Sequence, residues 1–348
     1  MLKLRFLVFI CTLAACAQLS AAEPQVSAEQ LRSWLSYLAS DEMKGRANGS
    51  PEIRKAADWL AERYKEAGMK PAPGRSSYFQ HAKITHRGSD ELIDIINVIG
   101  YLEGSDPSLK DEYILISGHY DHVGVNLELE GDTIFNGADD DGSGVVLGLG
   151  IIHTLHKMKQ DPNFKGFKRS LVIVAWAGEE LGLKGSKSYM KDPFLPVEKM
   201  NVNLNFEMVG HTQKKGKKQV WMVGNKFSDL FSIIHDDFAP FGWTLAEDAF
   251  PKMNLFFRSD NATFALLETN REARTAVGIP AHSFSTWGGE EHYHQVTDEP
   301  DKIDYENLAG LTEIMSHVVV KVANREKRIE WIENDFLQFS RPQPAKAE

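Results

Sequence analysis

The sequence contains almost no cysteine. Its two cysteines, Cys11 and Cys16, both lie within the first 16 of the 348 residues. The rest of the chain therefore forms no disulfide bond, and cysteine-ligated zinc and a cysteine nucleophile are excluded there. An exported chain without disulfides is more typical of a bacterial periplasm or cell surface than of animal secretion.

Long apolar runs and fibrous repeats are absent as well. No apolar run of ~18 residues, no regular glycine period and no sustained heptad is present, which excludes multi-span membrane proteins, collagen and coiled coils. Basic residues are outnumbered, 39 Lys+Arg against 49 Asp+Glu, giving a net charge of -10. Sequence-independent binding to nucleic acid is excluded because it depends on neutralising phosphates. The composition, 42% hydrophobic and 25% charged, is that of a globular protein.

The N-terminus has the layout of a secretory signal. Lys3 and Arg5 precede a short apolar stretch, and small residues follow as far as Ala22. Two processing routes are open: cleavage after Ala22, or lipidation of Cys16 in the lipobox-like segment 13–16, which makes 1–15 the signal. The apolar stretch is too short for a transmembrane anchor. We expect an exported protein, either periplasmic, secreted or an outer-membrane lipoprotein, with one catalytic domain over 23–348, monomeric.

Hydrophobic periodicity predicts an α/β fold. Residues 28–70 have two helical patterns separated by a polar turn at 41–46. From residue 92, strand-like and helical segments alternate. The strand-like runs are 93–101, 113–117, 171–176, 202–206, 219–223 and 280–285, and the helical patterns are 143–158, 227–237 and 305–332. We expect a three-layer sandwich, with a mostly parallel, mixed central sheet flanked by helices.

Histidines and carboxylates follow five of these strands or the neighbouring loops. They are His119, Asp121 and His122; Asp139, Asp140 and Asp141; Glu179 and Glu180; Glu207; and His292, His294 and Asp298. Taken singly, a Glu pair is usually solvated, and acids before a helix usually stabilise its N-terminus. Their joint occurrence indicates a metal site, because the strand ends of an open α/β sheet form its ligand-binding edge. Histidine and carboxylate ligands suit zinc, with manganese or cobalt as alternatives.

Three other motifs are incomplete. The glycines at 142, 144 and 148 do not have G-x-G-x-x-G spacing, and the helix-borne H-E-x-x-H motif is absent. His119-x-Asp121-His122 lacks the further histidine of metallo-β-lactamase-like hydrolases, because residue 117 is Ser117.

In combination, the strand-end motifs resemble those of the co-catalytic di-zinc exopeptidases, typified by bacterial secreted leucyl aminopeptidases. Glutamate carboxypeptidases and glutaminyl cyclases are relatives in that family. The similar segments are H-x-D at 119–121, G-A-D-D-x-x-S-G at 137–144, G-E-E-x-G-x-x-G-S at 178–186, N-x-E-M-x-G at 205–210, and Y-H at 293–294 before T-D-x-x-D-K-I at 297–303. Together with the stretches around 38–46 and 68–73, the resemblance covers nearly all of the chain after its leader.

The resemblance implies a ligand set for two zinc ions. Asp140 would bridge both ions, His119 and Glu207 would complete one, and Glu180 and His294 would complete the other. The family usually has Asp where this chain has Glu207. The additional methylene leaves the occupancy of that position and the substrate preference open.

The resemblance also implies an aminopeptidase that hydrolyses the N-terminal peptide bond of peptides with metal-activated water. Glu179 would be the general base, Asp121 would hydrogen-bond and orient His119, and Tyr293 would donate to the developing oxyanion. Asp298 would support the loop of the last histidine ligand. Metal ions lower the pKa of bound water, and a neighbouring carboxylate then accepts its proton.

Three other functions stay open. A carboxypeptidase or dipeptidase would need an arginine near the metals, for which Arg258 is a candidate. A glutaminyl cyclase and a non-catalytic binding protein on the same scaffold are the other two. Ser259-Asp260-Asn261 stands where many relatives have S-D-H, and 267–277 resembles an insertion, so this region is expected to shape the substrate pocket.

Overall fold

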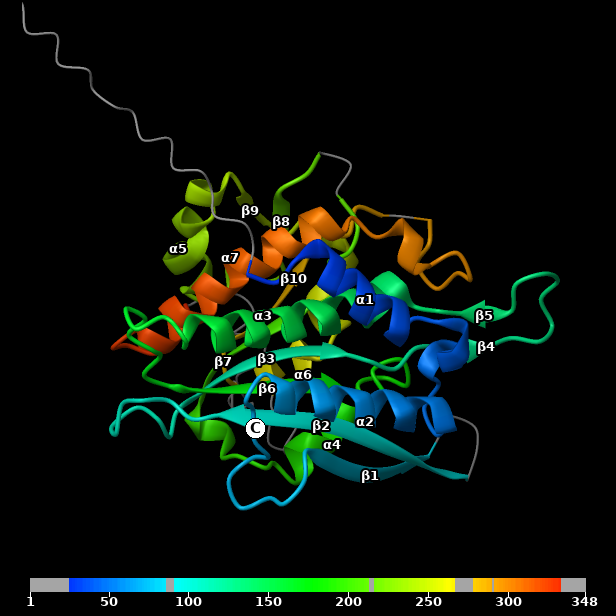
Figure 1. The fold of residues 1–348 in the computed structure, drawn as a ribbon, viewed down its shortest axis with the longest axis horizontal. Coiled ribbons are helices and arrows are strands. Elements are labelled where there is room, and N and C mark those ends of the chain that lie inside the picture. The colour runs from blue at the N-terminus through cyan, green and yellow to red at the C-terminus, as the bar shows by residue number, and fades with distance from the viewer. Residues whose placement is uncertain (1–24, 86–90, 213–215, 267–277, 290, 333–348) are drawn as a thin grey trace, which may run out of the picture.

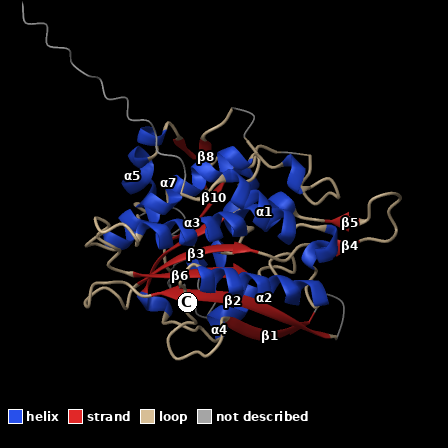
Figure 2. Ribbon diagram, in the orientation of Figure 1, coloured by secondary structure: helices blue, strands red, loops and turns tan. Residues whose placement is uncertain are grey.

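An eight-stranded sheet with the order β1-β2-β6-β3-β7-β10-β8-β9 runs through the molecule (Figures 1 and 2). The computed structural model describes residues 25–85, 91–212, 216–266, 278–289 and 291–332. The strands are β1 (Phe79–Thr85), β2 (Leu92–Leu102), β3 (Tyr113–His119), β6 (Ser170–Trp176), β7 (Met200–Phe206), β8 (Gln219–Met222), β9 (Thr244–Glu247) and β10 (Ala281–Ser285). A separate hairpin of β4 (Gly124–Val125) and β5 (Ile134–Phe135) projects from the body.

The central strands are apolar on both faces. Ile114 and Ile116 of β3 belong to the core on one side of the sheet, and Leu115 belongs to the core on the other. Successive side chains of a strand point to opposite faces, so a strand covered on both sides has a continuous apolar run. This burial explains why 113–117 and 171–176 could be predicted as strands.

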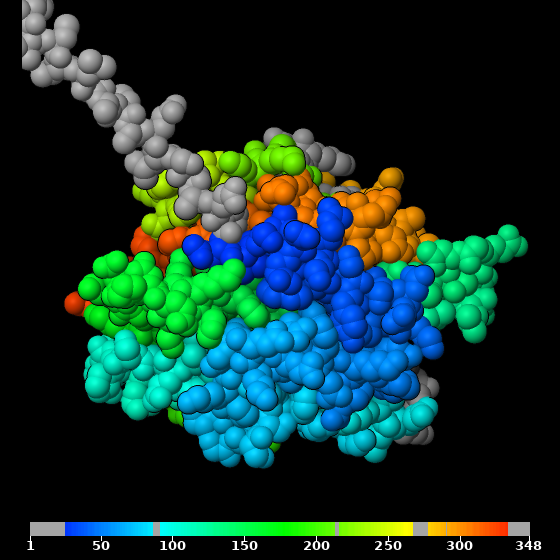
Figure 3. All heavy atoms as spheres, in the orientation of Figure 1, coloured from blue at the N-terminus to red at the C-terminus, as the bar shows by residue number. Residues whose placement is uncertain are grey.

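Helices cover both faces of the sheet. One layer contains α1 (Ala28–Leu38), α2 (Pro51–Glu66), α3 (Gly144–Met158) and α7 (Tyr305–Asn324), and the opposite layer contains α4 (Lys184–Lys191) and α6 (Asn261–Leu266). The short α5 (Leu230–Ile234) lies near the β8–β9 edge. In the space-filling view, α1 and α2 form a continuous cover over one face (Figure 3). The predicted sandwich with a mixed sheet is confirmed.

The sequence patterns missed or overextended several elements. β1 and α4 were missed, since neither has a continuous apolar stripe: only Gly185, Ser186 and Tyr189 of α4 are buried. The pattern at 227–237 contains only α5 and a following turn. The helix predicted over 305–332 ends at Asn324, because the next residues are extended and Arg169 donates to the carbonyls of Arg325 and Glu326.

Several predictions concern residues outside the described ranges. They are the signal segment, the lipidation site Cys16, and the insertion at 267–277. Among the residues that the structure describes, no helix is long and apolar enough to cross a membrane.

The turn at 41–46, predicted to be polar, contains a fully buried arginine. Arg46 donates from Nε to the carbonyl of Tyr120 (2.7 Å) and from Nη1 to those of Leu38 (2.8 Å) and Asn136 (2.7 Å). Nη2 donates to the carbonyl of Gly137 at 2.9 Å. Burial lowers the pKa of Arg46 to about 10, so the side chain stays charged at neutral pH. It therefore ties the end of α1 to the loops after β3 and before α3.

We expect Arg46→Met to lower the free energy of unfolding by about 3 kcal/mol or more. Four buried carbonyls would lose their donor, and each unsatisfied buried group costs about 1–3 kcal/mol. Arg46→Lys should recover only part of this loss, because an ammonium group cannot reproduce the planar fork. Urea denaturation followed by circular dichroism measures the change. Lys65→Met, at an exposed position of α2, is the matched control. A loss below about 1 kcal/mol for Arg46→Met would contradict the expectation.

Candidate metal centre

Four neighbouring parallel strands, β6, β3, β7 and β10, bring the predicted ligands to one edge of the sheet. His119 is the last residue of β3, and Glu207 directly follows β7. Glu180 follows β6 by four residues, and His294 lies in the loop after β10. Parallel strands end at the same edge, which is why side chains far apart in the sequence meet there.

The first group of donor atoms contains His119, Asp140 and Glu207. The Nε2 atom of His119 lies 3.3 Å from Oδ1 of Asp140 and 3.3 Å from Oε1 of Glu207. His119 and Asp140 are buried, whereas Glu207 is partly exposed. The extra methylene of Glu207 thus leaves its carboxylate within reach of the group.

The second group contains Asp140 and Glu180 together with two histidines. The Nε2 atom of His294 lies 3.2 Å from Oδ2 of Asp140 and 3.2 Å from Oε2 of Glu180.

His122 also belongs to this group, with Nδ1 2.9 Å from Oε1 of Glu180. The family resemblance assigns His122 no role, although its place in the H-x-D-H run is a signal for one. Oδ2 of Asp140, Oε1 of Glu180 and both ring nitrogens of His122 are buried without a hydrogen-bond partner among the described residues. Such atoms fit a divalent metal ion.

Asp121 orients His119 in a different way from the one predicted. The Nδ1–H group of His119 donates to the main-chain carbonyl of Asp121 at 3.1 Å, so Nε2 is free to face the donor group. The carboxylate of Asp121 is 3.7 Å from Nδ1 and instead accepts from the backbone N–H groups of Glu179 (3.2 Å) and Glu180 (3.3 Å) and from Asn48 (2.7 Å). Asp121 therefore anchors the Glu179–Glu180 turn.

The three consecutive aspartates have different roles. Asp141 accepts from the backbone N–H groups of His119 (3.1 Å) and Met208 (3.0 Å), which ties β3 to the end of β7. Asp139 accepts from the N–H of Gly210 at 2.7 Å. Only Asp140 reaches both donor groups. Asp298, which we expect to support the loop of His294, accepts with its carboxylate from the N–H groups of Asp139 (2.8 Å) and Asp140 (3.0 Å).

The pKa values of two neighbouring acids of the site are shifted in opposite directions. Burial raises the pKa of Glu179 well above 4.5, and the negative charges of Glu207 and Asp260 act in the same direction. Burial would also raise the pKa of Glu180, but His122 and His294 outweigh it and lower that pKa to about 2. Two adjacent glutamates thus have opposite shifts. A carboxylate that stays ionised suits a metal ligand, and one with a raised pKa suits a proton carrier.

An apolar pocket of about 190 Å³ adjoins the first donor group. Glu207, Tyr293 and Arg258 lie at its polar end. Ser259 donates to Oε2 of Glu207 at 2.5 Å and holds that side chain in place. Burial raises the pKa of Tyr293 to about 12, so its hydroxyl keeps its proton. The apolar lining consists of Met208, Trp221, Val223, Met253, Leu255 and Trp287.

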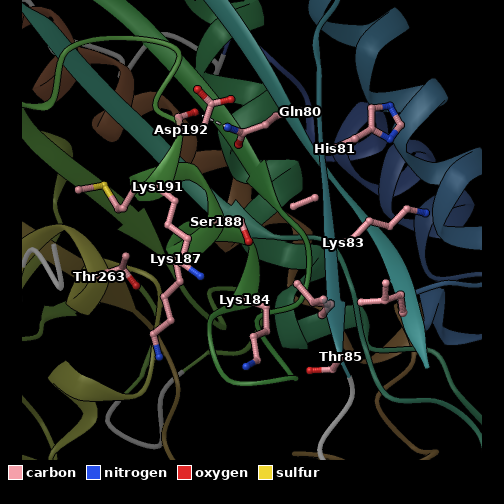
Figure 4. A pocket seen from close by; sticks show the side chains of 14 residues that line it. Gln80, His81, Lys83, Thr85, Lys184, Lys187, Ser188, Lys191, Asp192 and Thr263 are labelled. Carbon is pink, nitrogen blue, oxygen red and sulfur yellow. Dashed lines mark hydrogen bonds between the residues drawn. The ribbon is translucent and has the colours of Figure 1, made fainter. Parts of the chain in front are cut away.

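A larger cleft of about 530 Å³ lies between β1 and α4. Its lining includes Lys184, Lys187 and Lys191 of α4 and Lys83 of β1, whose side chain points away from α4 (Figure 4). The cleft shares no lining residue with the two donor groups or the apolar pocket. The larger hollow is thus not the one beside the reactive side chains.

Comparison with known proteins agrees with this geometry. The chain is 28% identical over 198 residues to a probable zinc metalloprotease of Pyrenophora teres f. teres, covering 54% of this chain and 40% of that protein. It is 28% identical over 165 residues to leucine aminopeptidase 1 of Sclerotinia sclerotiorum, covering 46% and 38%. These alignments thus span less than half of the relatives' length. The fold is similar to that of Porphyromonas gingivalis glutaminyl cyclase, with a TM-score of 0.63, 18% identity, and coverage of 85% of this chain and 98% of that one.

A family model supplies the assignment. The model for peptidase family M28 matches residues 97–319, which contain every residue of the two donor groups. The match covers well over half of the chain. The chain therefore belongs to peptidase family M28.

Proposed function

We propose that the protein is a zinc aminopeptidase that removes N-terminal residues from peptides. The observation that carries the proposal is the placement of Glu179, with its raised pKa, directly beside Glu180 in a cluster of buried metal donors. A glutamate with a raised pKa, next to a metal centre, is the arrangement that hydrolysis of a peptide bond requires.

Two zinc ions would be held by the two donor groups, with Asp140 shared between them. When bound, they would polarise the scissile carbonyl and lower the pKa of the attacking water. Glu179 takes the proton of that water and delivers it to the leaving amine. The hydroxyl of Tyr293, at the polar end of the pocket, donates to the oxyanion. Asp121 holds the backbone of Glu179 and so fixes the position of the base.

The charge around the pocket favours a substrate with a free amine. The carboxylate of Glu207 lies at the polar end, where the ammonium group of a substrate would meet it. A negative charge at that position stabilises the ammonium group. The apolar lining would receive the first side chain of the peptide. We therefore expect N-terminal residues with apolar side chains to be preferred.

The test is turnover of a peptide panel by the purified, zinc-loaded protein. Each peptide is supplied with a free and with an acetylated N-terminus, with and without a zinc chelator, and products are identified by mass spectrometry. We expect chelator-sensitive release of the first residue from free peptides only. Cleavage that is indifferent to acetylation would overturn the aminopeptidase proposal.

Arg258 favours one second candidate, a carboxypeptidase or dipeptidase. Its guanidinium group lies at the polar end of the pocket, where Nη2 donates to the hydroxyl of Tyr293 at 3.4 Å. An exposed arginine there could hold the terminal carboxylate of a short substrate. Release of the last residue from acetylated peptides would support this candidate. A peptide with N-terminal glutamine also tests the cyclase alternative, because cyclisation releases ammonia and leaves the chain length unchanged.

A further inference from the structure

His122 is a buried histidine that the ligand set implied by the family resemblance leaves unused. It lies three residues after His119, and its side chain has an exposed fraction of 0%. Neither ring nitrogen has a hydrogen-bond partner among the described residues. A buried polar group without a partner costs about 1–3 kcal/mol. The hydrogen bonds of the described residues therefore leave the ring unsatisfied.

The Nδ1 atom of His122 points at two oxygens that lack partners as well. It lies 2.9 Å from Oε1 of Glu180 and 4.0 Å from Oδ2 of Asp140. The shorter distance is that of an ion pair, although its geometry does not make a hydrogen bond. Three buried donor atoms that lie within 4.8 Å of one another are arranged as ligands around a common ion.

His294 completes this group from the opposite side. Its Nε2 atom is 3.2 Å from an oxygen of Asp140 and 3.2 Å from the second oxygen of Glu180. The rings of His122 and His294 meet edge to face, with their centroids 5.6 Å apart. One carboxylate oxygen of Glu180 thus faces each histidine. The group contains two imidazoles and two carboxylates.

The backbone provides the space for His122. Gly137 precedes the aspartate triplet with φ at +58°, and a Cβ atom built there would lie 2.5 Å from Cγ of His122. Any other residue at this position would displace the ring. The loop that positions Asp140 thus packs directly against the imidazole of His122. The position of the ring therefore depends on the same loop as the position of Asp140.

We propose that His122 is a fourth protein ligand of the second metal position, beside Asp140, Glu180 and His294. This inference rests on the metal centre of the proposed function. The first position has three protein ligands, His119, Asp140 and Glu207. Zinc sites with four protein ligands are closed and structural, whereas those with three keep a position for water or substrate. The two metal positions would therefore differ in function. The second would hold its ion tightly, and the first would stay open to substrate.

Zinc affinity measured by competition with a chromophoric chelator tests the assignment. His122→Asn should weaken the tighter of the two sites about 100-fold or more, because even indirect partners of metal ligands change affinity 10–100-fold. The weaker site should change much less. His292→Gln, which removes a neighbouring imidazole bonded to Thr297 through Nδ1, is the matched control and should keep both affinities. Two unchanged affinities in His122→Asn would overturn the inference.

A measurement on the unmodified protein avoids any folding defect of the variant. With one zinc equivalent bound, X-ray absorption should show two imidazoles per zinc, because the closed position fills first. One imidazole would contradict the assignment. Peptide turnover by the protein loaded with two zinc equivalents separates the two proposals, because the position open to substrate fills second. Turnover by a protein whose tight site has a single imidazole would reject only the role of His122. Two imidazoles without turnover of the fully loaded protein would reject only the aminopeptidase.

Discussion

Glu179→Gln should lower kcat by about 10²- to 10⁴-fold, the range for loss of a general base, while zinc content stays at the wild-type level. Glutamine has the same shape but cannot accept the proton of the attacking water. The backbone N–H of residue 179 still donates to Asp121, so the turn that positions Glu180 is retained. Steady-state kinetics and metal analysis on the same preparation measure the two effects separately.

Two further variants test whether the loss of activity is specific to the carboxylate of Glu179. Glu179→Asp keeps a carboxylate and should retain part of the activity, since the shorter side chain only misplaces it. Glu198→Gln makes the same chemical change on an exposed residue of another loop and should leave kcat unchanged. If Glu179→Gln stays within about tenfold of wild type, Glu179 is not the base. Loss of zinc from this variant would instead place Glu179 among the ligands.

Asp140→Asn should weaken both metal positions, by about 100-fold each or more, and so abolish detectable turnover. Asp140 is the only residue that belongs to both donor groups of the described chain. Asparagine keeps the size of the side chain but loses the negative charge that attracts two cations. Zinc retained after dialysis, measured by mass spectrometry of the metal, should fall to near zero per chain.

Variants of unshared ligands provide the comparison. Glu207→Ala should lose the ion of the first position only, and His294→Ala should mainly weaken the second. The two partial losses and the complete loss together test the sharing of Asp140. If Asp140→Asn retains one zinc with wild-type affinity, the aspartate serves a single position and the two-ion arrangement is wrong.

The strands that could be predicted from the sequence are those that are buried along their whole length. β3 and β6 are covered on both faces, so their apolar runs stand out in the sequence. β1 at the sheet edge alternates buried and exposed residues, and its partner α4 buries mainly small side chains. Their positions depend on packing between distant segments, which local periodicity does not contain. The expected cleavage and lipidation of the N-terminus stay predictions.

For the site, the residue types at the strand ends predicted which side chains lie together. They did not predict how the side chains in the loops are oriented. The five expected ligands lie together, because their positions follow from parallel strands ending at one edge. His122, the anchoring of the Glu179 turn by Asp121, and the capping of the aspartate loop by Asp298 depend on loop geometry. Arg46 was assigned to a polar turn although four main-chain carbonyls surround it. None of these contacts has a periodic signature.

The donor side chains come from five segments spread between residues 119 and 294, which sets the order in which the protein can be assembled. Contacts between such distant segments form late, because the chain must first close long loops. A zinc ion therefore meets a complete binding site only after β6, β3, β7 and β10 have paired. It then stabilises the native state by mass action rather than nucleating it. The metal ions present where the chain folds would thus decide which metal the protein receives.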